Sequence, residues 1–165
     1  MAGGPRLILV VDTSTLLDLE SVGGLLSLPK LARSVHVLDV VLNECGMELA
    51  DKIRRAGYQE IAVSQNWVLP AIGLKTAALS LTDALVLYYA KKNKAILIAS
   101  DGPLRKQAVR HGVEVHGAIW VAEQAFDGGL IKQDELCAWL DGWIVSGRRL
   151  PQDEIDRLRK ALACR

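Results

Sequence analysis

Two acidic residues stand immediately after runs of apolar residues. Asp12 follows residues 6–11, RLILVV, and Asp101 follows residues 95–100, AILIAS. Continuous apolar runs of this length are typical of strands that are buried on both faces of a parallel sheet. Because functional sites of such sheets form outside the carboxyl ends of the strands, we expect both carboxylates at one edge of the sheet.

Two further acids fall in the first turns of predicted helices. Glu44 follows a predicted strand at residues 34–39, and Asp83 lies near the start of the helix expected over residues 79–94, which Ser80 or Thr82 can cap. A carboxylate is favoured at the positive end of a helix dipole, which is also a suitable place to present it to a cation. Both acids are therefore expected near the same sheet edge.

Four converging carboxylates predict a metal site. Two carboxylates about 4 Å apart repel each other by roughly 4 kcal/mol at an effective dielectric of about 20, so a cluster needs cations or protons. Oxygen ligands without His or Cys suit Mg²⁺ or Mn²⁺. Such an ion generates hydroxide from water and neutralises the charge of a phosphodiester. Each acid taken alone has an ordinary structural explanation, as a helix cap, a turn residue or a solvated helix residue.

The elements that must position these acids alternate between strand and helix. Further strands are expected at 34–39 and 113–117 and an extended segment at 61–69, which ends at Pro70. Helices are expected within 13–32 with a break at Gly23-Gly24, over 40–57 as one helix, and over 102–112. This order predicts a three-layer α/β fold with a central, mostly parallel sheet flanked by helices.

The length of 165 residues predicts one domain, with a core over about 6–125 and a helical C-terminal tail over about 126–165. In the tail, Ile155, Leu158 and Leu162 recur at helical spacing and predict packing, which we expect on the same chain. No apolar run is long enough to span a membrane, and a cytoplasmic protein is expected. The formal net charge of only +1 gives no support by itself for nucleic-acid binding.

Several other residues have side chains that can act as functional groups. The three cysteines, Cys45, Cys137 and Cys164, are far apart in the sequence, so neither a zinc site nor a disulfide is predicted. Arg105 and Arg110 follow Asp101 on one helix and are candidate contacts for RNA phosphates, although a solvated helix face is the simpler interpretation.

Asp18 and Asp39 are rival acids. We expect Asp18 on an exposed helix face, whereas Asp39 stands at a strand end and is the alternative to Glu44.

Three segments together resemble the PIN-domain family, including the VapC-type toxins of bacteria and a less characterised bacterial branch. They are VVDTSTLLDL at 10–19, VVLNEC at 40–45 and LSLTDALVLYYAKKNKAILIASDGPLRKQAVRHGVEVHG at 79–117, and the likeness covers about residues 6–125. The family pattern has an acid after the first strand, a Glu on an early helix, an S-x-x-D-A helix and a strand ending in T-x-D. The chain departs from it at Ala99, where Thr is usual, and at Gly102-Pro103, where some members carry a further acid.

The resemblance implies endonucleolytic cleavage of RNA that leaves a 5′-phosphate. It implies that Asp12, Asp83 and Asp101 hold Mg²⁺ or Mn²⁺, that Glu44 binds the ion or positions the water, and that Ser14 is the polar residue near the metal. It also implies a homodimer and, for a toxin, a small antitoxin protein as partner. The predicted function is thus a metal-dependent endoribonuclease, the toxin of a toxin–antitoxin pair.

Two alternatives remain open at this stage. Ala99 and the near-neutral charge are also compatible with a catalytically degenerate PIN fold that acts as a binding or scaffold module. The other alternative is a phosphoryl-transfer enzyme with Asp12 as nucleophile, as in the haloacid-dehalogenase family. That family needs an acid two residues further on, where this chain has Ser14.

Overall fold

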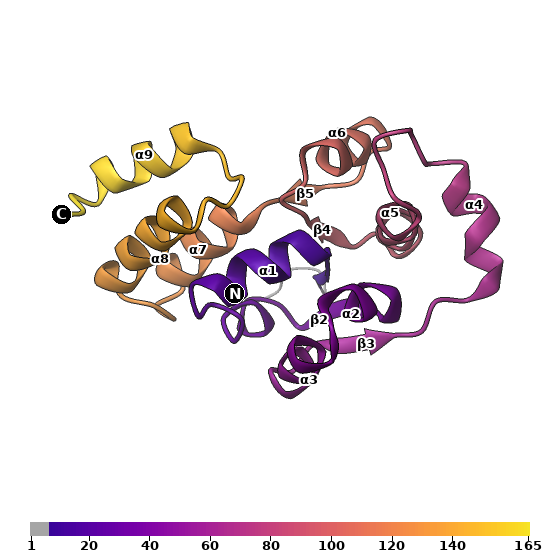
Figure 1. Ribbon diagram of the computed structural model, residues 1–165, viewed down its shortest axis with the longest axis horizontal. Helices are drawn as coiled ribbons and strands as arrows, with labels where there is room; N and C mark the ends of the chain where they lie inside the picture. The colour runs from indigo at the N-terminus through magenta and orange to yellow at the C-terminus, as the bar shows by residue number, and fades with distance from the viewer. Residues whose placement is uncertain (1–6) are drawn as a thin grey trace.

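The computed structural model describes residues 7–165 and contains a five-stranded, wholly parallel sheet (Figure 1). The strand order is β3-β2-β1-β4-β5. The strands are β1 (Ile8–Val11), β2 (Ser34–Leu38), β3 (Gln59–Ile61), β4 (Ile96–Ile98) and β5 (Val115–His116). The prediction of an α/β fold around a mostly parallel sheet is confirmed.

Helices flank this sheet and join its strands (Figure 1). They are α1 (Thr13–Ser21), α2 (Asp39–Cys45), α3 (Met47–Arg55), α4 (Val68–Ile72), α5 (Leu81–Asn93), α6 (Gly102–Arg110), α7 (Ala118–Asp127), α8 (Gln133–Ser146) and α9 (Gln152–Ala161). Short 3₁₀ turns lie at Leu28–Lys30 and Gln65–Trp67. None of the helices within residues 7–165 has the length and apolar character needed to cross a membrane.

The central strand β1 lies at the point where the strand order reverses. The chain leaves β1 toward β2 and β3 on one side and then returns to β4 on the other side. Val11 is paired with Ile98 of β4, and the backbone N–H of Asp12 donates to the Ile98 carbonyl at 3.0 Å. The residues that follow β1 and β4 therefore emerge side by side, at the kind of switch point where parallel sheets bind ligands.

Two predicted elements were wrong. The single helix expected over 40–57 is two helices, because Gly46 adopts φ +84°, a conformation that ends α2 before α3 begins. The segment expected to be extended over 61–69 is a strand only to Ile61 and then turns into α4. Pro70 lies in the first turn of α4, where a missing N–H costs no helical hydrogen bond.

The helices that position Asp83 and Asp101 begin as predicted. Ser80 caps α5 in a reciprocal arrangement in which its hydroxyl accepts from the Asp83 N–H and the Asp83 carboxylate accepts from the Ser80 N–H. Asp101 caps α6, with Pro103 in the first turn. These contacts join residues within three positions of one another, so they hold both acids at helix N-termini without any help from tertiary packing.

The C-terminal helices α7, α8 and α9 lie together at one side of the molecule; α7 and α8 contact α1, and α9 contacts α8 (Figure 1). Trp143 of α8 is fully buried and its indole N–H donates to the backbone carbonyl of Asp18 at 2.8 Å. Ile155 and Leu158 of α9 are buried in the same hydrophobic cluster as β1, so the tail packs on its own chain as expected.

The expectation that no disulfide forms was wrong. Cys137 of α8 and Cys164 after α9 are bonded to each other, with Cα atoms 5.6 Å apart. Their 27-residue separation hides the pairing in the sequence, because it arises only when α9 folds back along α8. Cys45 is a free thiol.

Candidate metal-binding and nuclease site

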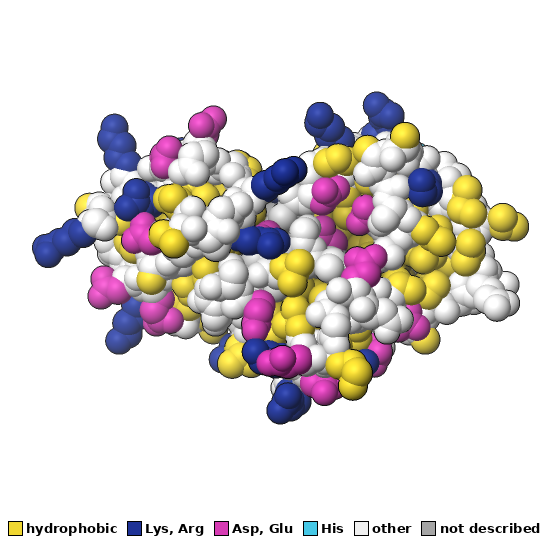
Figure 2. Space-filling model, viewed as in Figure 1, with side chains coloured by type: hydrophobic (Ala, Val, Ile, Leu, Met, Phe, Trp, Pro, Cys, Tyr) yellow, Lys and Arg dark blue, Asp and Glu magenta, His cyan; other side chains and the backbone are white. Residues whose placement is uncertain are grey.

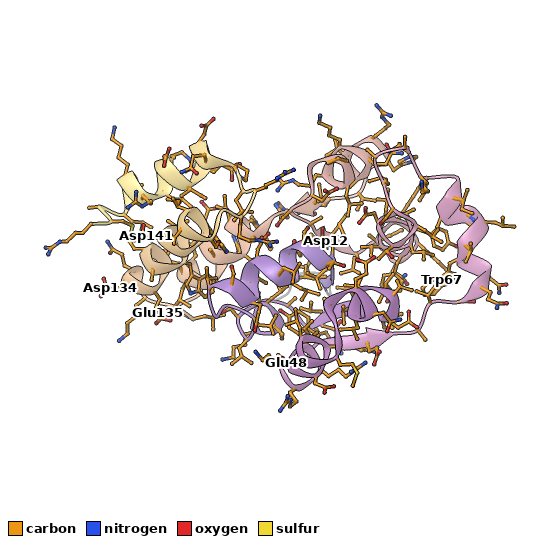
Figure 3. All side chains as sticks on the ribbon, in the orientation of Figure 1. Asp12, Glu48, Trp67, Asp134, Glu135 and Asp141 are labelled. Carbon is orange, nitrogen blue, oxygen red and sulfur yellow. A yellow bond between two sulfur atoms is a disulfide. The ribbon has the colours of Figure 1, made fainter. Side chains whose placement is uncertain are left out.

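Asp12 is the buried acid at the centre of the site (Figure 3). It caps α1 and is only 3% exposed. One carboxylate oxygen accepts from the Thr15 N–H at 2.8 Å and the other from the Ser14 hydroxyl at 2.7 Å. Burial raises the pKa of Asp12 to about 6 and the nearby charge of Asp83 adds to this, although the hydrogen bonds from Thr15 and Ser14 oppose it.

Asp101 stands beside Asp12 across the β1–β4 pair. Its carboxylate accepts from the Leu104 N–H at 3.0 Å, as expected for a helix cap. The hydroxyls of Thr15 on α1 and of Ser100 just before Asp101 are 3.2 Å apart. Ala99 is fully buried and offers no polar group. Ser100 and Thr15 are thus the hydroxyl groups at this strand end.

Asp83 links the acids electrostatically. The pKa of Asp83 is raised first by partial burial and also by the negative charges of Asp101 and Glu44, against the hydrogen bonds from Ser80. The charge of Asp83 in turn contributes to the raised pKa of Asp12. Asp83 is thus near the other three acids, and the convergence of all four on one metal ion stays a prediction.

Glu44 is the exposed member of the group. It lies on α2, and its Oε2 accepts from the Thr13 hydroxyl at 2.7 Å. Thr13 directly follows Asp12, so this bond ties α2 to the start of α1. The rival acid Asp39 has a different task, because its Oδ1 accepts from the backbone N–H of Val40 and of Val63.

The chemistry of the donors fits a hard divalent cation. All four side chains offer carboxylate oxygens, and a cation would stabilise the ionised forms of Asp12 and Asp83, whose pKa values are raised mainly by burial. Each carboxylate accepts a hydrogen bond from this chain: those of Asp12, Asp83 and Asp101 accept from backbone N–H groups within three residues, and that of Glu44 accepts from Thr13. Among residues 7–165, no group of three or more His, Cys, Asp or Glu side chains is arranged so that it could hold a metal ion.

A cleft of about 460 Å³ opens beside Asp101, which is the one candidate acid of the four that lines it. Its walls are Ser14, Asp18, Ser100, Asp101, Gly102, Pro103, Gly147, Arg148 and Arg149. Figure 2 shows the molecule hollowed between the C-terminal helices and the rest, with Lys and Arg side chains on one side of the hollow and Asp and Glu on the other. The cleft is therefore a charged groove that reaches from Asp101 to the chain between α8 and α9.

The expectation for Asp18 was wrong. Asp18 is 2% exposed, and one of its carboxylate oxygens accepts from Nε of Arg148. Another guanidinium nitrogen of Arg148 donates to the Ser14 carbonyl at 3.3 Å. Neither Arg148 nor Arg149 was predicted to be functional. In the sequence they are visible only as a pair of arginines between Gly147, which ends a helix, and Pro151, which precedes the next one. This pattern does not indicate where the segment packs.

The structure does not bring the two predicted phosphate contacts into this cleft. The Arg105 guanidinium packs over Gly117, in a separate cavity of about 170 Å³ that it shares with His116 and Trp120. Arg110 is exposed at the far end of α6, about 13 Å from Asp101 along the helix axis at about 1.5 Å per residue.

Comparisons with known proteins show the family and the fold of the chain. The family model described as "DUF3368: PIN domain" matches residues 8–163. The chain is also similar in structure to a PilT N-terminus domain protein from the hyperthermophilic archaeon Sulfolobus solfataricus P2. The TM-score is 0.55 at 16% identity, over 73% of this chain and 95% of that one. No curated protein matches the chain. PIN domains are generally nucleases that use divalent metal ions. Because this family model matches the chain over nearly its whole length, and the sheet is wholly parallel as in the predicted fold, the protein belongs to the PIN-domain family.

Proposed function

We propose that this protein is a Mg²⁺- or Mn²⁺-dependent endoribonuclease and the toxin of a toxin–antitoxin pair. The observation that supports the proposal is the placement of Asp12 and Asp101 directly after the paired strands β1 and β4, with Glu44 joined to this edge by the hydrogen bond from Thr13. A protein gains nothing in stability by gathering unpaired carboxylates. A cation and a phosphodiester as ligands would account for acids at these positions.

Each acid has a distinct task in this proposal. Asp12, Asp83 and Asp101 hold the ion, and Glu44 binds it or positions the attacking water. A bound Mg²⁺ or Mn²⁺ supplies charge neutralisation for the phosphodiester and lowers the pKa of water. Ser14 and Thr15 hold the Asp12 carboxylate in place, and Thr13 does the same for Glu44.

The test is cleavage of a mixed, end-labelled RNA pool by the purified protein with Mn²⁺ or Mg²⁺. Cleavage should vanish in EDTA and in Asp12→Asn. Asp134→Asn, an exposed acid in the first turn of α8, is the matched control and should cleave like the wild type (Figure 3). Products with a 5′-phosphate would support the hydrolytic route.

The main alternative is a binding module without catalysis. It is favoured by the buried Ala99, which leaves no Thr hydroxyl at its position. A folded protein that neither cleaves RNA nor is stabilised by Mn²⁺ would refute the nuclease proposal and favour the binding module.

The toxin role adds three proposals: a cytoplasmic location, a homodimer and a small antitoxin partner. Expression of the wild type in bacteria should arrest growth, whereas Asp12→Asn should not. Co-expression with the product of a small adjacent reading frame should restore growth. Light scattering after gel filtration measures the oligomer; a monomer at all concentrations would refute the dimer.

A further inference from the structure

The side of the cleft that faces the acids is basic. Arg148 and Arg149 both line it, and they come from the short segment between α8 and α9. Arg149 is exposed and forms no ion pair with another described residue. Arg148 is half-buried and uses Nε and one terminal nitrogen for Asp18 and the Ser14 carbonyl, which leaves its other terminal nitrogen without a partner among residues 7–165.

Contacts at both ends of the segment hold it in place. Gly147 ends α8 in the left-handed conformation, φ +70°, and turns the chain toward the cleft. Before it, Trp143 is fixed to the Asp18 carbonyl. After it, α9 is joined to α8 by the Cys137–Cys164 disulfide and by an ion pair from Arg159 to Asp141 at 2.8 Å.

Asp18 joins the segment between α8 and α9 to the helix that carries the candidate site. It lies on α1, the helix that Asp12 caps, and its buried carboxylate balances the charge of Arg148. With Asp18 neutralised in this way, the charges left on the cleft wall are the acid Asp101 on one side and Arg149 on the other, with the unused edge of Arg148 beside it.

An RNA substrate needs such a basic wall. The four acids repel a polyanion, and the formal net charge of +1 offers no general attraction. Of the described arginines and lysines, only Arg148 and Arg149 line this cleft. A guanidinium presents a planar fork of donors that matches two phosphate oxygens, and about 460 Å³ is within the range of ligand pockets, about 300–1,000 Å³.

We propose that Arg148 and Arg149 form a phosphate-binding subsite for single-stranded RNA, which seats the backbone next to the bond cleaved at the acids. Arg149 contacts the phosphate directly, and Asp18 is a positioning residue that holds Arg148 and its segment at the cleft. This inference rests on the proposed nuclease function, because it assigns the substrate contact of that same site.

The test measures binding apart from cleavage. Arg149→Glu and Arg149→Ala are made in the Asp12→Asn background, where RNA stays intact, and the Kd for a short fluorescein-labelled single-stranded RNA is measured by anisotropy over a range of salt concentrations. We expect Arg149→Glu to weaken binding by about tenfold, as for loss of a charge-assisted hydrogen bond. Loss of one phosphate contact should lower the slope of log Kd against log salt by about 0.7.

The matched control is Arg55→Glu, an equal charge reversal on α3, outside the cleft. It should leave the Kd and the salt slope unchanged. With Asp12 intact, Arg149→Glu should raise KM for RNA cleavage much more than it lowers kcat, and its melting temperature should equal that of the wild type.

The outcomes separate the two proposals. A wild type that cleaves RNA, together with an Arg149→Glu protein that binds and cleaves as Arg55→Glu does, overturns the subsite and leaves the nuclease standing. A wild type that neither binds nor cleaves RNA overturns the nuclease proposal and the subsite with it. A loss of affinity in Arg149→Glu alone supports both.

Discussion

The Thr13 hydroxyl donates to the Glu44 carboxylate at 2.7 Å and so joins the first residue of α1 to the end of α2. Thr13 and Glu44 are 31 residues apart in sequence. Because Asp12 immediately precedes Thr13, this bond sets the distance from the exposed acid of the site to its buried one. This contact orients the Glu44 side chain, which would otherwise extend freely into solvent.

Removal of this hydroxyl should affect catalysis more than stability. We expect Thr13→Val to lower kcat/KM by about tenfold, which corresponds to about 1.4 kcal/mol of transition-state stabilisation. Its effect on unfolding should stay below about 1 kcal/mol, because the bond is exposed. Steady-state cleavage of a defined RNA gives the first value and urea unfolding the second. Thr13→Ser keeps the hydroxyl and should restore activity; a fully active Thr13→Val would show that Glu44 needs no orientation.

Asp12→Asn should stabilise the metal-free protein at neutral pH. The folded-state pKa of about 6 lies above the ordinary value of 3.8. The folded protein therefore holds the proton more tightly, and its stability falls as the pH rises from about 3.8 to 6. With about 1.4 kcal/mol for each pKa unit, ionised Asp12 costs on the order of 2–3 kcal/mol above about pH 6.

The measurement is urea unfolding of Asp12→Asn and wild type in EDTA at about pH 7.5 and about pH 4. The variant should be more stable at the higher pH and lose most of this advantage at the lower one. Asp134→Asn, which is exposed, should match the wild type at both. A variant less stable than the wild type at the higher pH would mean that the Ser14 and Thr15 hydrogen bonds outweigh the buried charge.

Binding of Mn²⁺ should weaken steeply below about pH 6. The raised pKa values of Asp12 and Asp83 make both carboxylates retain protons that a metal must displace. We expect Mn²⁺ to raise the melting temperature at about pH 7.5 and to have little effect at about pH 5. The Asp12→Asn protein should show no such rise at either pH. An equal rise at both pH values in the wild type would exclude Asp12 and Asp83 as ligands.

Arg148→Ala should destabilise the fold, unlike Arg149→Ala. Loss of Arg148 leaves the Asp18 carboxylate buried without its charged partner, and its Oδ2 already has no hydrogen bond from a described residue. We expect a loss on the order of 2–3 kcal/mol, reduced from the cost for a fully buried pair because Arg148 is 31% exposed. Arg149→Ala should change the free energy of unfolding by less than about 0.5 kcal/mol. Equal stability of the two variants would argue against the Asp18–Arg148 pair in solution.

The purified, unreduced protein should show one reactive thiol after unfolding and three after reduction. Cys137 and Cys164 are bonded, and only Cys45 is free. In the folded protein Cys45 should react slowly, because burial, followed by the charges of Glu44 and Asp12, raises the pKa of its thiol to about 11. Cys137→Ser should lower stability by about 3–4 kcal/mol on the chain-entropy account of a 27-residue loop, with Cys45→Ser as the control. Three thiols before reduction would contradict the disulfide.

The sequence by itself determined the elements that carry the acids. The apolar runs before Asp12 and Asp101 make buried parallel strands, because such segments have no polar face to turn to water. The caps of α5 and α6 depend on residues within three positions of one another, so Ser80, Asp83 and Asp101 could be placed without tertiary contacts. The sequence alone did not show that Gly46 would divide the helix predicted over 40–57, because a helix can tolerate an isolated glycine.

Only the tertiary structure decided what faces the acids. Asp18 looked like an exposed helix residue because the partner that buries it, Arg148, is 130 positions away. Arg105 and Arg110 share a helix with Asp101, yet that helix carries them away from the cleft, whereas the segment between α8 and α9 enters it. Contacts at such separations depend on how whole helices pack on one another. Local propensity and hydrophobic spacing carry no information about that packing. The positions of the acids at strand and helix ends could therefore be predicted from the sequence, whereas the position of Arg148 and Arg149 in the cleft could not.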